Sequence, residues 1–198
     1  MPDFRCAAVI LAAGASTRLG RPKQLLRIEG ESLLRRTARI AVEAGCAPVY
    51  VVLGFNAQQM QPELQDLAVQ VIVNESWREG MGSSLRAGME ELRKADPLPE
   101  AVLLLVCDQP RLTADHLRQL LILHTASDNP GITASVYGHK AGVPAVFRSR
   151  LFPALLASQG DRGARDLIRA HSTEAQGIPW PEGELDIDRP EDLVTIER

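Results

Sequence analysis

Short runs of apolar residues alternate along this chain with segments whose apolar positions recur every three to four residues. The first pattern is typical of strands buried on both faces of a sheet, and the second is typical of amphipathic helices. The predicted strands are Ala7–Leu11, Val49–Leu53, Val69–Val73, Ala101–Val106, Ile132–Val136 and Val143–Phe147. The predicted helices are Ser32–Ala44, Ala57–Leu67, Ser83–Lys94 and Ala114–His124.

This alternation predicts an α/β fold, a three-layer α/β/α, Rossmann-like arrangement in which helices cover both faces of a mostly parallel sheet. The rhythm changes after residue 130, because only the turn 137–142 separates the last two predicted strands. That connection is too short for a crossover helix, so we expect an antiparallel pair and a mixed C-terminal half of the sheet. No linker or internal repeat interrupts the pattern, and residues 1–198 are expected to form one domain.

The composition is that of an ordinary globular protein, with 45% hydrophobic and 24% charged residues. A net charge of −3 argues against a nucleic-acid binder that works by phosphate neutralisation. Cys6, Cys46 and Cys107 are isolated, which favours reduced, buried thiols over a disulfide framework or a zinc site. No signal peptide and no apolar run of ~18–20 residues is present, so we expect a cytoplasmic protein without a membrane partner.

The loop after the first predicted strand carries the strongest chemical signal in the chain. A buried strand that ends in a glycine-containing loop is a usual way to hold a nucleoside triphosphate, because backbone N–H groups can approach the phosphates. The residues expected to bind the nucleotide here are Leu11, Ala12, Ala13, Gly14, Arg18 and Lys23. The spacing matches neither a P-loop nor the G-x-G-x-x-G dinucleotide fingerprint. A solvated basic loop is the alternative.

Carboxylates from two distant segments are expected to meet that loop. Asp108 follows the buried strand Ala101–Val106, whose carboxyl end would carry it to the ligand-binding edge of the sheet. Asp186 and Asp188 lie on one side of a short extended piece near the C-terminus. Carboxylates ~4 Å apart repel by roughly 4 kcal/mol at an effective dielectric of about 20, so convergence of Asp108 and Asp188 predicts bound Mg²⁺ or Mn²⁺. The alternative is that each carboxylate caps backbone N–H groups.

Two further segments contain polar residues suited to a ligand. Segment 74–88 opens a helix, and the hydroxyls of Ser83 and Ser84 would read a base or ribose; the alternative is a capped helix with Trp77 covering the core. Segment 160–166 places arginines beside glycines near a helix start, which suits an anion or is simply a turn with exposed ion pairs. The histidines are scattered, and we expect none of them to be catalytic.

Taken in order, these segments resemble the molybdenum cofactor cytidylyltransferase branch of the nucleotidyltransferases related to molybdenum cofactor guanylyltransferase. The matching pieces are Leu11-Ala12-Ala13-Gly14-x-Ser16-x-Arg18-x-Gly20-x-Pro22-Lys23, Asn74…Trp77…Gly80-Met81…Ser84-Leu85…Gly88, Asp108-Gln109-Pro110, Gly142-x-Pro144-x-x-Phe147, Gly160-Asp161-x-Gly163-Ala164-Arg165 and Asp186-Ile187-Asp188-x-Pro190-Glu191-Asp192-Leu193. They span nearly the whole chain. In guanylyltransferases the first piece usually begins Leu-Ala-Gly-Gly. This chain has Ala13 in place of the first of these glycines, and in this it resembles the cytidylyltransferase-like members.

The resemblance implies a nucleotidyltransferase fold and the transfer of CMP from CTP to the phosphate of molybdopterin, with release of pyrophosphate. Arg18 and Lys23 would hold the triphosphate, and Asp108 and Asp188 would bind Mg²⁺. The backbone of Ala12-Ala13-Gly14 and the Ser83-Ser84 region would select the base. The residues implied to face the pterin are Gly142, Pro144, Asp161 and Arg165. A molybdenum hydroxylase apoenzyme would receive the product.

Other functions on the same scaffold remain open at this point. A guanylyltransferase would use GTP, and a sugar-phosphate nucleotidyltransferase would share Arg18, Lys23 and Asp108 without needing the segment 160–165. A non-catalytic carrier or chaperone for a molybdenum hydroxylase would keep only a vestigial nucleotide site. A dinucleotide-dependent oxidoreductase is disfavoured, because the glycine fingerprint is missing.

Overall fold

A computed structural model describes residues 4–126, 130–160 and 163–195, so Asp161 lies outside the described residues. The strands are β1 (Cys6–Ala12), β2 (Arg27–Ile28), β3 (Glu31–Ser32), β4 (Val49–Leu53), β5 (Gln70–Val73), β6 (Ala101–Val106), β7 (Ile132–Tyr137), β8 (Lys140–Arg148) and β9 (Ala175–Pro179). The α-helices are α1 (Leu33–Glu43), α2 (Ala57–Met60), α3 (Met81–Leu92), α4 (Ala114–Ala126), α5 (Phe152–Leu156) and α6 (Ala164–Ala170). Short 3₁₀ turns cover Lys23–Leu25, Gln61–Leu64, Trp77–Glu79, Ser149–Leu151, Ser172–Glu174, Pro181–Glu184 and Pro190–Thr195.

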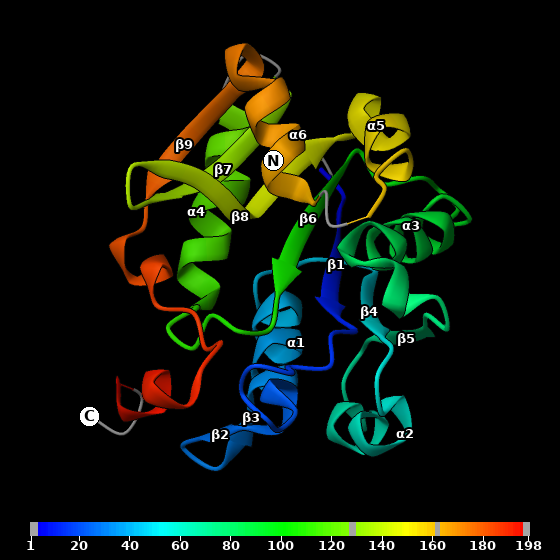
Figure 1. The fold of residues 1–198 in the computed structure, drawn as a ribbon. Coiled ribbons are helices and arrows are strands. Elements are labelled where there is room, and N and C mark those ends of the chain that lie inside the picture. The colour runs from blue at the N-terminus through cyan, green and yellow to red at the C-terminus, as the bar shows by residue number, and fades with distance from the viewer. Residues whose placement is uncertain (1–3, 127–129, 161–162, 196–198) are drawn as a thin grey trace.

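Within the described ranges, seven strands form one sheet in the order β5-β4-β1-β6-β8-β7-β9 (Figure 1). Strands β5, β4, β1 and β6 are parallel neighbours, β8 runs antiparallel to both β6 and β7, and β9 is parallel to β7. The predicted α/β architecture is confirmed, with its mostly parallel sheet, its mixed C-terminal half and its antiparallel β7–β8 pair.

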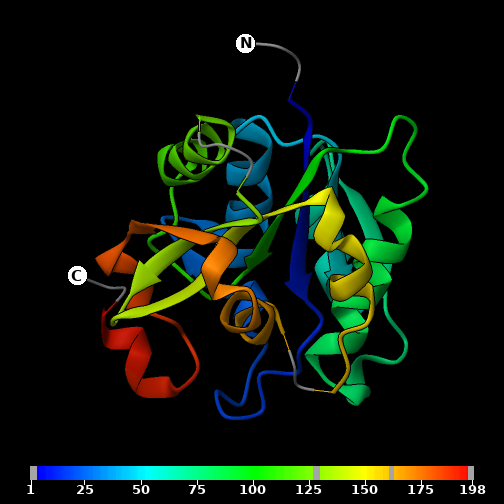
Figure 2. The same cartoon turned by 90° about the horizontal axis from the view of Figure 1, so that it is seen from above.

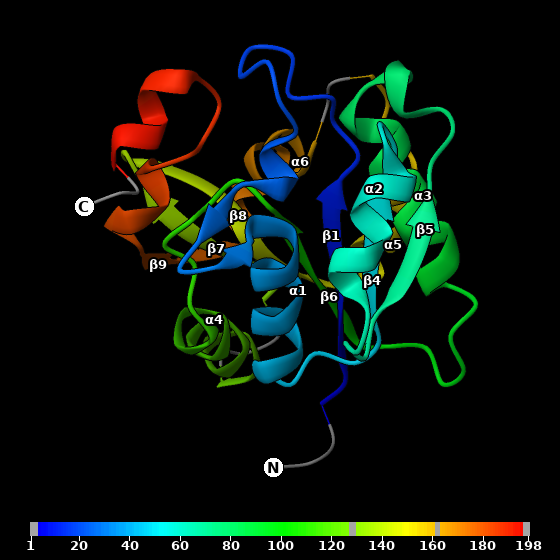
Figure 3. The same ribbon diagram turned by 90° about the horizontal axis from the view of Figure 1, so that it is seen from below.

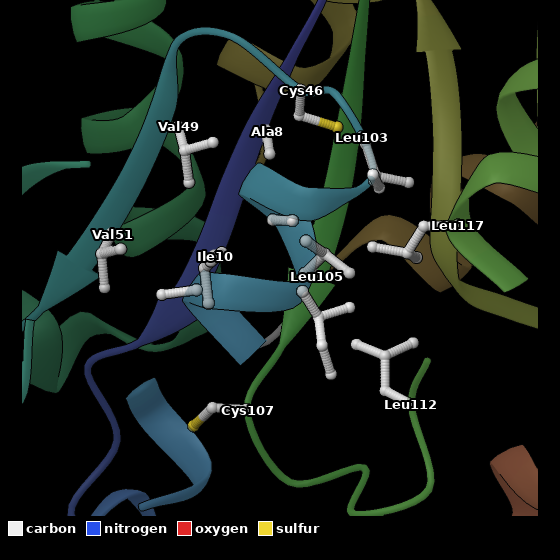
Figure 4. Packing of buried hydrophobic residues seen from close by; sticks show 14 of the residues in the cluster. Ala8, Ile10, Cys46, Val49, Val51, Leu103, Leu105, Cys107, Leu112 and Leu117 are labelled. Carbon is white, nitrogen blue, oxygen red and sulfur yellow. The ribbon is translucent and has the colours of Figure 1, made fainter. Parts of the chain in front are cut away.

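Helices cover both faces of the sheet because the central strands are apolar on both faces. Along β1, Ala8 and Ile10 pack in one core with α1 and α4, whereas Ala7 and Val9 pack in a second core with α3, α5 and α6. Figures 2 and 3 show these two helix groups on opposite sides of the strands. Figure 4 shows the first core, in which Ile10 of β1 and Leu105 of β6 lie side by side.

One helix and three elements of the C-terminal half differ from the prediction. The helix expected over Ala57–Leu67 is α only as far as Met60, since Pro62 has no N–H to donate to the carbonyl of Gln58. Strand β9 and helices α5 and α6 were not predicted, because none carries a clear apolar period. Thr113 caps α4, with its hydroxyl oxygen accepting from the His116 N–H at 3.2 Å. In the described part of the chain, no helix is long and apolar enough to cross a membrane.

The three cysteines are free and buried, as expected from their sequence context. Burial, with a smaller effect from the neighbouring Asp108, raises the pKa of Cys107 to about 12. At neutral pH this thiol is therefore protonated and unreactive.

Helix α3 approaches the sheet closely at Gly88. A Cβ at this position would lie 2.5 Å from Cγ1 of Val9 and 3.1 Å from Cγ2 of Val52. We expect Gly88→Ala to lower the free energy of unfolding by about 1–3 kcal/mol, because the added methyl overpacks a buried contact. Urea unfolding measures this change. Gly14→Ala is the control, since no described atom lies within 4 Å of the added Cβ; equal stability of the two variants would contradict the prediction.

His124 makes the folded state sensitive to acid. Its ring is fully buried, its Nδ1 lies 2.8 Å from Oγ1 of Thr133, and burial together with Arg148 and Arg150 lowers the pKa of His124 to about 3 from an ordinary 6.5. The unfolded chain binds this proton at a higher pH than the folded chain, so the stabilisation is complete above about pH 6.5 and is lost as the pH falls toward 3. We expect about 2 kcal/mol of unfolding free energy to be lost through this residue between pH 7 and pH 5.

Urea unfolding of wild type and His124→Gln at both pH values tests this expectation. The variant should lose less stability on acidification than wild type does. His139→Gln, at an exposed position in the β7–β8 turn, is the control and should keep the wild-type pH dependence. The same pH dependence in wild type and His124→Gln would contradict the assignment.

Candidate functional site

The site lies at the edge of the sheet where β1 and β6 end together. Leu11 pairs with Val106, so the loops that follow these parallel strands leave the sheet side by side, as the adjacent arrowheads in Figure 1 show. Strands β4 and β5 lie on one side of β1, and β6 lies on the other. An open parallel sheet binds ligands at such a switch in strand order, outside the carboxyl ends of the strands.

The loop after β1 is held in one shape by a buried amide. Gln24 is 1% exposed, and its Nε2 donates to the carbonyls of Ala12 and Gly14 at 2.8 Å each. The Ser16 hydroxyl accepts from the backbone N–H of Lys23 at 3.1 Å. These bonds tie the start of the loop to its end and thereby aim the Lys23 side chain. Gln24 was not singled out from the sequence, because a glutamine in a polar loop usually points to solvent.

Lys23 brings two distant segments of the chain to one ammonium group. Its Nζ lies 2.6 Å from Oδ2 of Asp108 and 3.8 Å from Oδ1 of Asp188. The side chains of Lys23 and Asp108 are only 18% and 19% exposed. Burial by itself lowers the pKa of Lys23, but the attraction of Asp108 and Asp188 outweighs it and raises the pKa above its ordinary value. The ammonium is therefore charged, and it offsets the repulsion between the carboxylates.

Arg18 completes this charged group from the solvent side. Its Nη1 lies 2.5 Å from Oδ2 of Asp188, and the hydrogen bond lowers the pKa of that carboxyl group. The Arg18 side chain is 70% exposed, so the pair contributes little to stability. The arginine is free to turn toward a ligand at small cost. All four predicted charged residues of the site thus meet at one place.

The backbone places Asp188 there, and Asp188 does not cap the last turn. The N–H of Ile187 donates to the carbonyl of Asp108 at 3.0 Å, and the Ile187 side chain is completely buried. The carboxylate of Asp192 accepts from the backbone N–H groups of Asp188 and Arg189, so Asp192 takes the capping role. Asp186 also faces the group: burial, and then the charges of Asp108 and Asp188, raise the pKa of Asp186.

The hydroxyls of Ser83 and Ser84 turn inward. Both residues are 4% exposed, and the amide of Asn74 donates to their Oγ atoms at 2.9 and 3.0 Å. The Ser83 hydroxyl also lies 2.9 Å from the carbonyls of Ser76 and Gly80. The two serines therefore fix the turn between β5 and α3. Their hydroxyls are buried and hydrogen-bonded within the protein, so they do not face an open ligand site. Trp77 stands edge-on to Phe55, with ring centroids 5.5 Å apart.

The residues implied to face the pterin are separated by the fold. Gly142 and Pro144 are buried within β8. A Cβ on Gly142 would lie 2.5 Å from the Tyr137 hydroxyl, and the Pro144 carbonyl accepts from the Ser135 hydroxyl at 2.8 Å. Arg165 is exposed at the start of α6, and the charges of Asp186 and Asp108 contribute to raising its pKa. Of the described residues in this set, Arg165 is the one whose pKa responds to the carboxylates of the site.

The loop geometry leads to a test on Gln24. Gln24→Met keeps the length of the side chain but removes the amide that donates to the carbonyls of Ala12 and Gly14. Both carbonyls then lose a hydrogen bond. We expect the free energy of unfolding to fall by about 1–3 kcal/mol and nucleotide binding to weaken, because the loop loses its tie. Urea unfolding and nucleotide titration measure the two effects. Gln119→Met, at an exposed position on α4, is the control and should change neither stability nor nucleotide binding. If Gln24→Met also leaves both unchanged, the Gln24 amide is not what fixes the loop.

Known proteins share this sequence and this arrangement. The family model described as MobA-like NTP transferase domain matches residues 8–175. Nicotine blue oxidoreductase of Paenarthrobacter nicotinovorans is 35% identical over 178 residues, which cover 84% of this chain and 83% of that protein. A probable molybdenum cofactor guanylyltransferase of Nostoc sp. is 29% identical over 195 residues, 96% of this chain and 89% of that protein.

Solved structures agree with these relatives. Rv0371c from Mycobacterium tuberculosis H37Rv superposes with a TM-score of 0.82 at 27% identity, covering 98% of this chain and 99% of that one. The same protein has been solved in complex with manganese, with a TM-score of 0.76 at 26% identity and 97% of each chain covered. The chain is a nucleotidyltransferase-fold protein and belongs to the MobA-like NTP transferase family.

Proposed function

We propose that this protein transfers CMP from CTP to the phosphate of molybdopterin, releasing pyrophosphate and giving molybdopterin cytosine dinucleotide. The observation that carries the proposal is the Lys23 ammonium, held between Asp108 and Asp188 where β1 and β6 end. A cation beside carboxylates is what a triphosphate and its metal require. Membership of the MobA-like family supports nucleotidyl transfer, and Ala13 in the first loop favours CTP.

In this proposal the cations hold the polyphosphate. Lys23 and Arg18 move from their carboxylate partners to the phosphates and neutralise the pyrophosphate that leaves. The backbone of Leu11, Ala12, Ala13 and Gly14 lies against the nucleotide. The turn fixed by Ser83 and Ser84 borders the base. Since phosphoryl-group transfer needs no covalent intermediate on the protein, positioning and charge supply the acceleration.

The carboxylates suit a hard divalent cation. Asp108 and Asp188 offer oxygen atoms, which Mg²⁺ and Mn²⁺ prefer, and one ammonium already fills the space between them. Within the described ranges, no three His, Cys, Asp or Glu side chains form a complete metal site. Mg²⁺ is usually bound by one or two carboxylates together with substrate phosphates, and Asp108 and Asp188 would supply these carboxylates. When bound, the metal would neutralise charge on the phosphates. The manganese complex of Rv0371c supports a metal in this fold.

A second candidate is transfer of GMP from GTP to the same acceptor. The relative from Nostoc sp., named a probable guanylyltransferase, covers nearly the whole chain and favours it. The relative from Paenarthrobacter nicotinovorans is named an oxidoreductase, but this chain lacks the dinucleotide fingerprint after β1. A sugar-phosphate nucleotidyltransferase or a cofactor carrier for a molybdenum hydroxylase would each give a different result in the experiment below.

Pyrophosphate release tests the proposal. The protein is incubated with CTP, GTP or ATP and Mg²⁺, with and without molybdenum-loaded molybdopterin, and with a sugar phosphate as the alternative acceptor. We expect release only with CTP and molybdopterin. Release with GTP alone among the nucleotides would replace the cytidylyl assignment by a guanylyl one. Release with the sugar phosphate alone would remove the pterin acceptor, and no release at all would favour a carrier.

Two substitutions test the assigned site. Lys23→Ala and Asp108→Ala should each lower kcat/KM by at least about 100-fold. Each substitution removes a charged group that stabilises the charge on the reacting phosphates. Lys94→Ala is the matched control for Lys23, since Lys94 is an exposed cation on the surface, paired with Glu91. Retained turnover in both site variants would place the reaction elsewhere.

A further inference from the structure

The ring of Tyr137, at the end of β7, is held from several sides. It stands edge-on to Trp180 at 6.0 Å and 85°, and Trp180 in turn stacks on His116 at 4.5 Å and 18°. Gly142 and Gly183 make room for it: a Cβ would lie 2.5 Å from the Tyr137 hydroxyl at Gly142 and 2.8 Å from its Cδ1 at Gly183. These contacts therefore fix the position of the Tyr137 hydroxyl.

That hydroxyl joins two sides of the site. It donates to the carbonyl of Val143 at 2.9 Å and accepts from Nη2 of Arg165 at 3.4 Å. The Val143 carbonyl also accepts from Nε2 of Gln109 at 3.0 Å, and Gln109 follows Asp108 directly. One carbonyl thus links the end of β6, which carries Asp108, to the side chain that restrains Arg165.

Arg165 needs such a restraint. Its side chain is exposed at the start of a short helix, and a free arginine side chain loses considerable rotamer entropy when it binds a ligand. The hydrogen bond to the Tyr137 hydroxyl is the largest cause of the raised pKa of Arg165, and the charges of Asp186 and Asp108 add to it. A guanidinium held in this way is ready to take a phosphate oxygen.

We propose that Tyr137 is a positioning residue that holds Arg165 in place to bind the phosphate of the acceptor, a phosphomonoester. The inference rests on the proposed function in that the second substrate carries a phosphate. Tyr137 itself does not touch the substrate. Its effect passes through Arg165, and Gly142 is glycine because the Tyr137 hydroxyl occupies the space of its side chain.

Steady-state kinetics of Tyr137→Phe tests the role, because the ring and its packing stay while the hydroxyl is lost. We expect the KM for molybdopterin to rise about three- to tenfold, as for one lost hydrogen bond, while the KM for CTP and the melting temperature stay near wild type. Tyr50→Phe is the matched control: Tyr50 lies in β4, which β1, β6 and β8 separate from β7, and among the described residues its hydroxyl has no hydrogen-bond partner. A rise in the KM for CTP with that for molybdopterin unchanged would overturn the inference.

A double-mutant cycle separates positioning from a general structural effect. If Tyr137 acts through Arg165, adding Tyr137→Phe to Arg165→Ala should raise the KM for molybdopterin no further. If the two substitutions multiply their effects, Tyr137 acts independently and the inference is wrong.

Titration with inorganic phosphate keeps this inference distinct from the proposed function. Calorimetry of wild type and Arg165→Ala measures the phosphate binding that depends on Arg165. Tyr137→Phe should weaken this Arg165-dependent binding about three- to tenfold. This result without any nucleotide turnover would support the inference and reject the proposed function. Turnover of CTP and molybdopterin with no phosphate binding that depends on Arg165 would reject the inference and keep the function.

Discussion

The site depends on one ammonium group that lies between carboxylates from separate parts of the chain. Lys23 Nζ contacts Asp108 at 2.6 Å and Asp188 at 3.8 Å in a partly buried position. Without a cation there, two carboxylates about 4 Å apart would repel by roughly 4 kcal/mol at an effective dielectric of about 20. A triphosphate with its metal satisfies the same charge requirement. The protein holds this arrangement with its own lysine, and in the proposed function a metal-bound triphosphate would take over these contacts.

Backbone contacts beneath these charges determine where they stand. Asp108 leaves β6 beside the loop after β1 because the two strands are parallel neighbours. The carbonyl of Asp108 then accepts from the Ile187 N–H, which brings the C-terminal segment with Asp188 to the same edge. Gln24 closes the first loop from inside. Lys23, Asp108 and Asp188 thus stand on hydrogen-bonded backbone, as a preorganised electrostatic site requires.

Much of this could be predicted from the sequence, and the rest depends on tertiary contacts. Strands β4 and β6 match their predicted ranges because a strand buried on both faces is a continuous apolar run. Strand β9 contains Gly177 and Pro179 and is only partly covered, so it gives no such signal. The convergence of Lys23 and Asp108 followed from the rule for strand ends. The burial of Gln24 could not be predicted, because only the folded loop surrounds that side chain.

The identity of residue 13 bears on the proposed choice of base through a contact of three segments. The Phe55 N–H donates to the Ala13 carbonyl at 3.1 Å, so the loops after β1 and β4 touch. A Cβ on Gly54 would lie 2.7 Å from the Trp77 Cβ and 2.9 Å from the Ala13 Cβ, which leaves no free space at this junction. A glycine in place of Ala13, as in loops of the guanylyltransferase type, would remove one of these contacts and open room beside Gly54. The hydroxyls of Ser83 and Ser84 are engaged in bonds within the protein. In the proposed function, the shape of this junction would therefore contribute more than hydroxyl contacts to the discrimination between a pyrimidine and a larger purine.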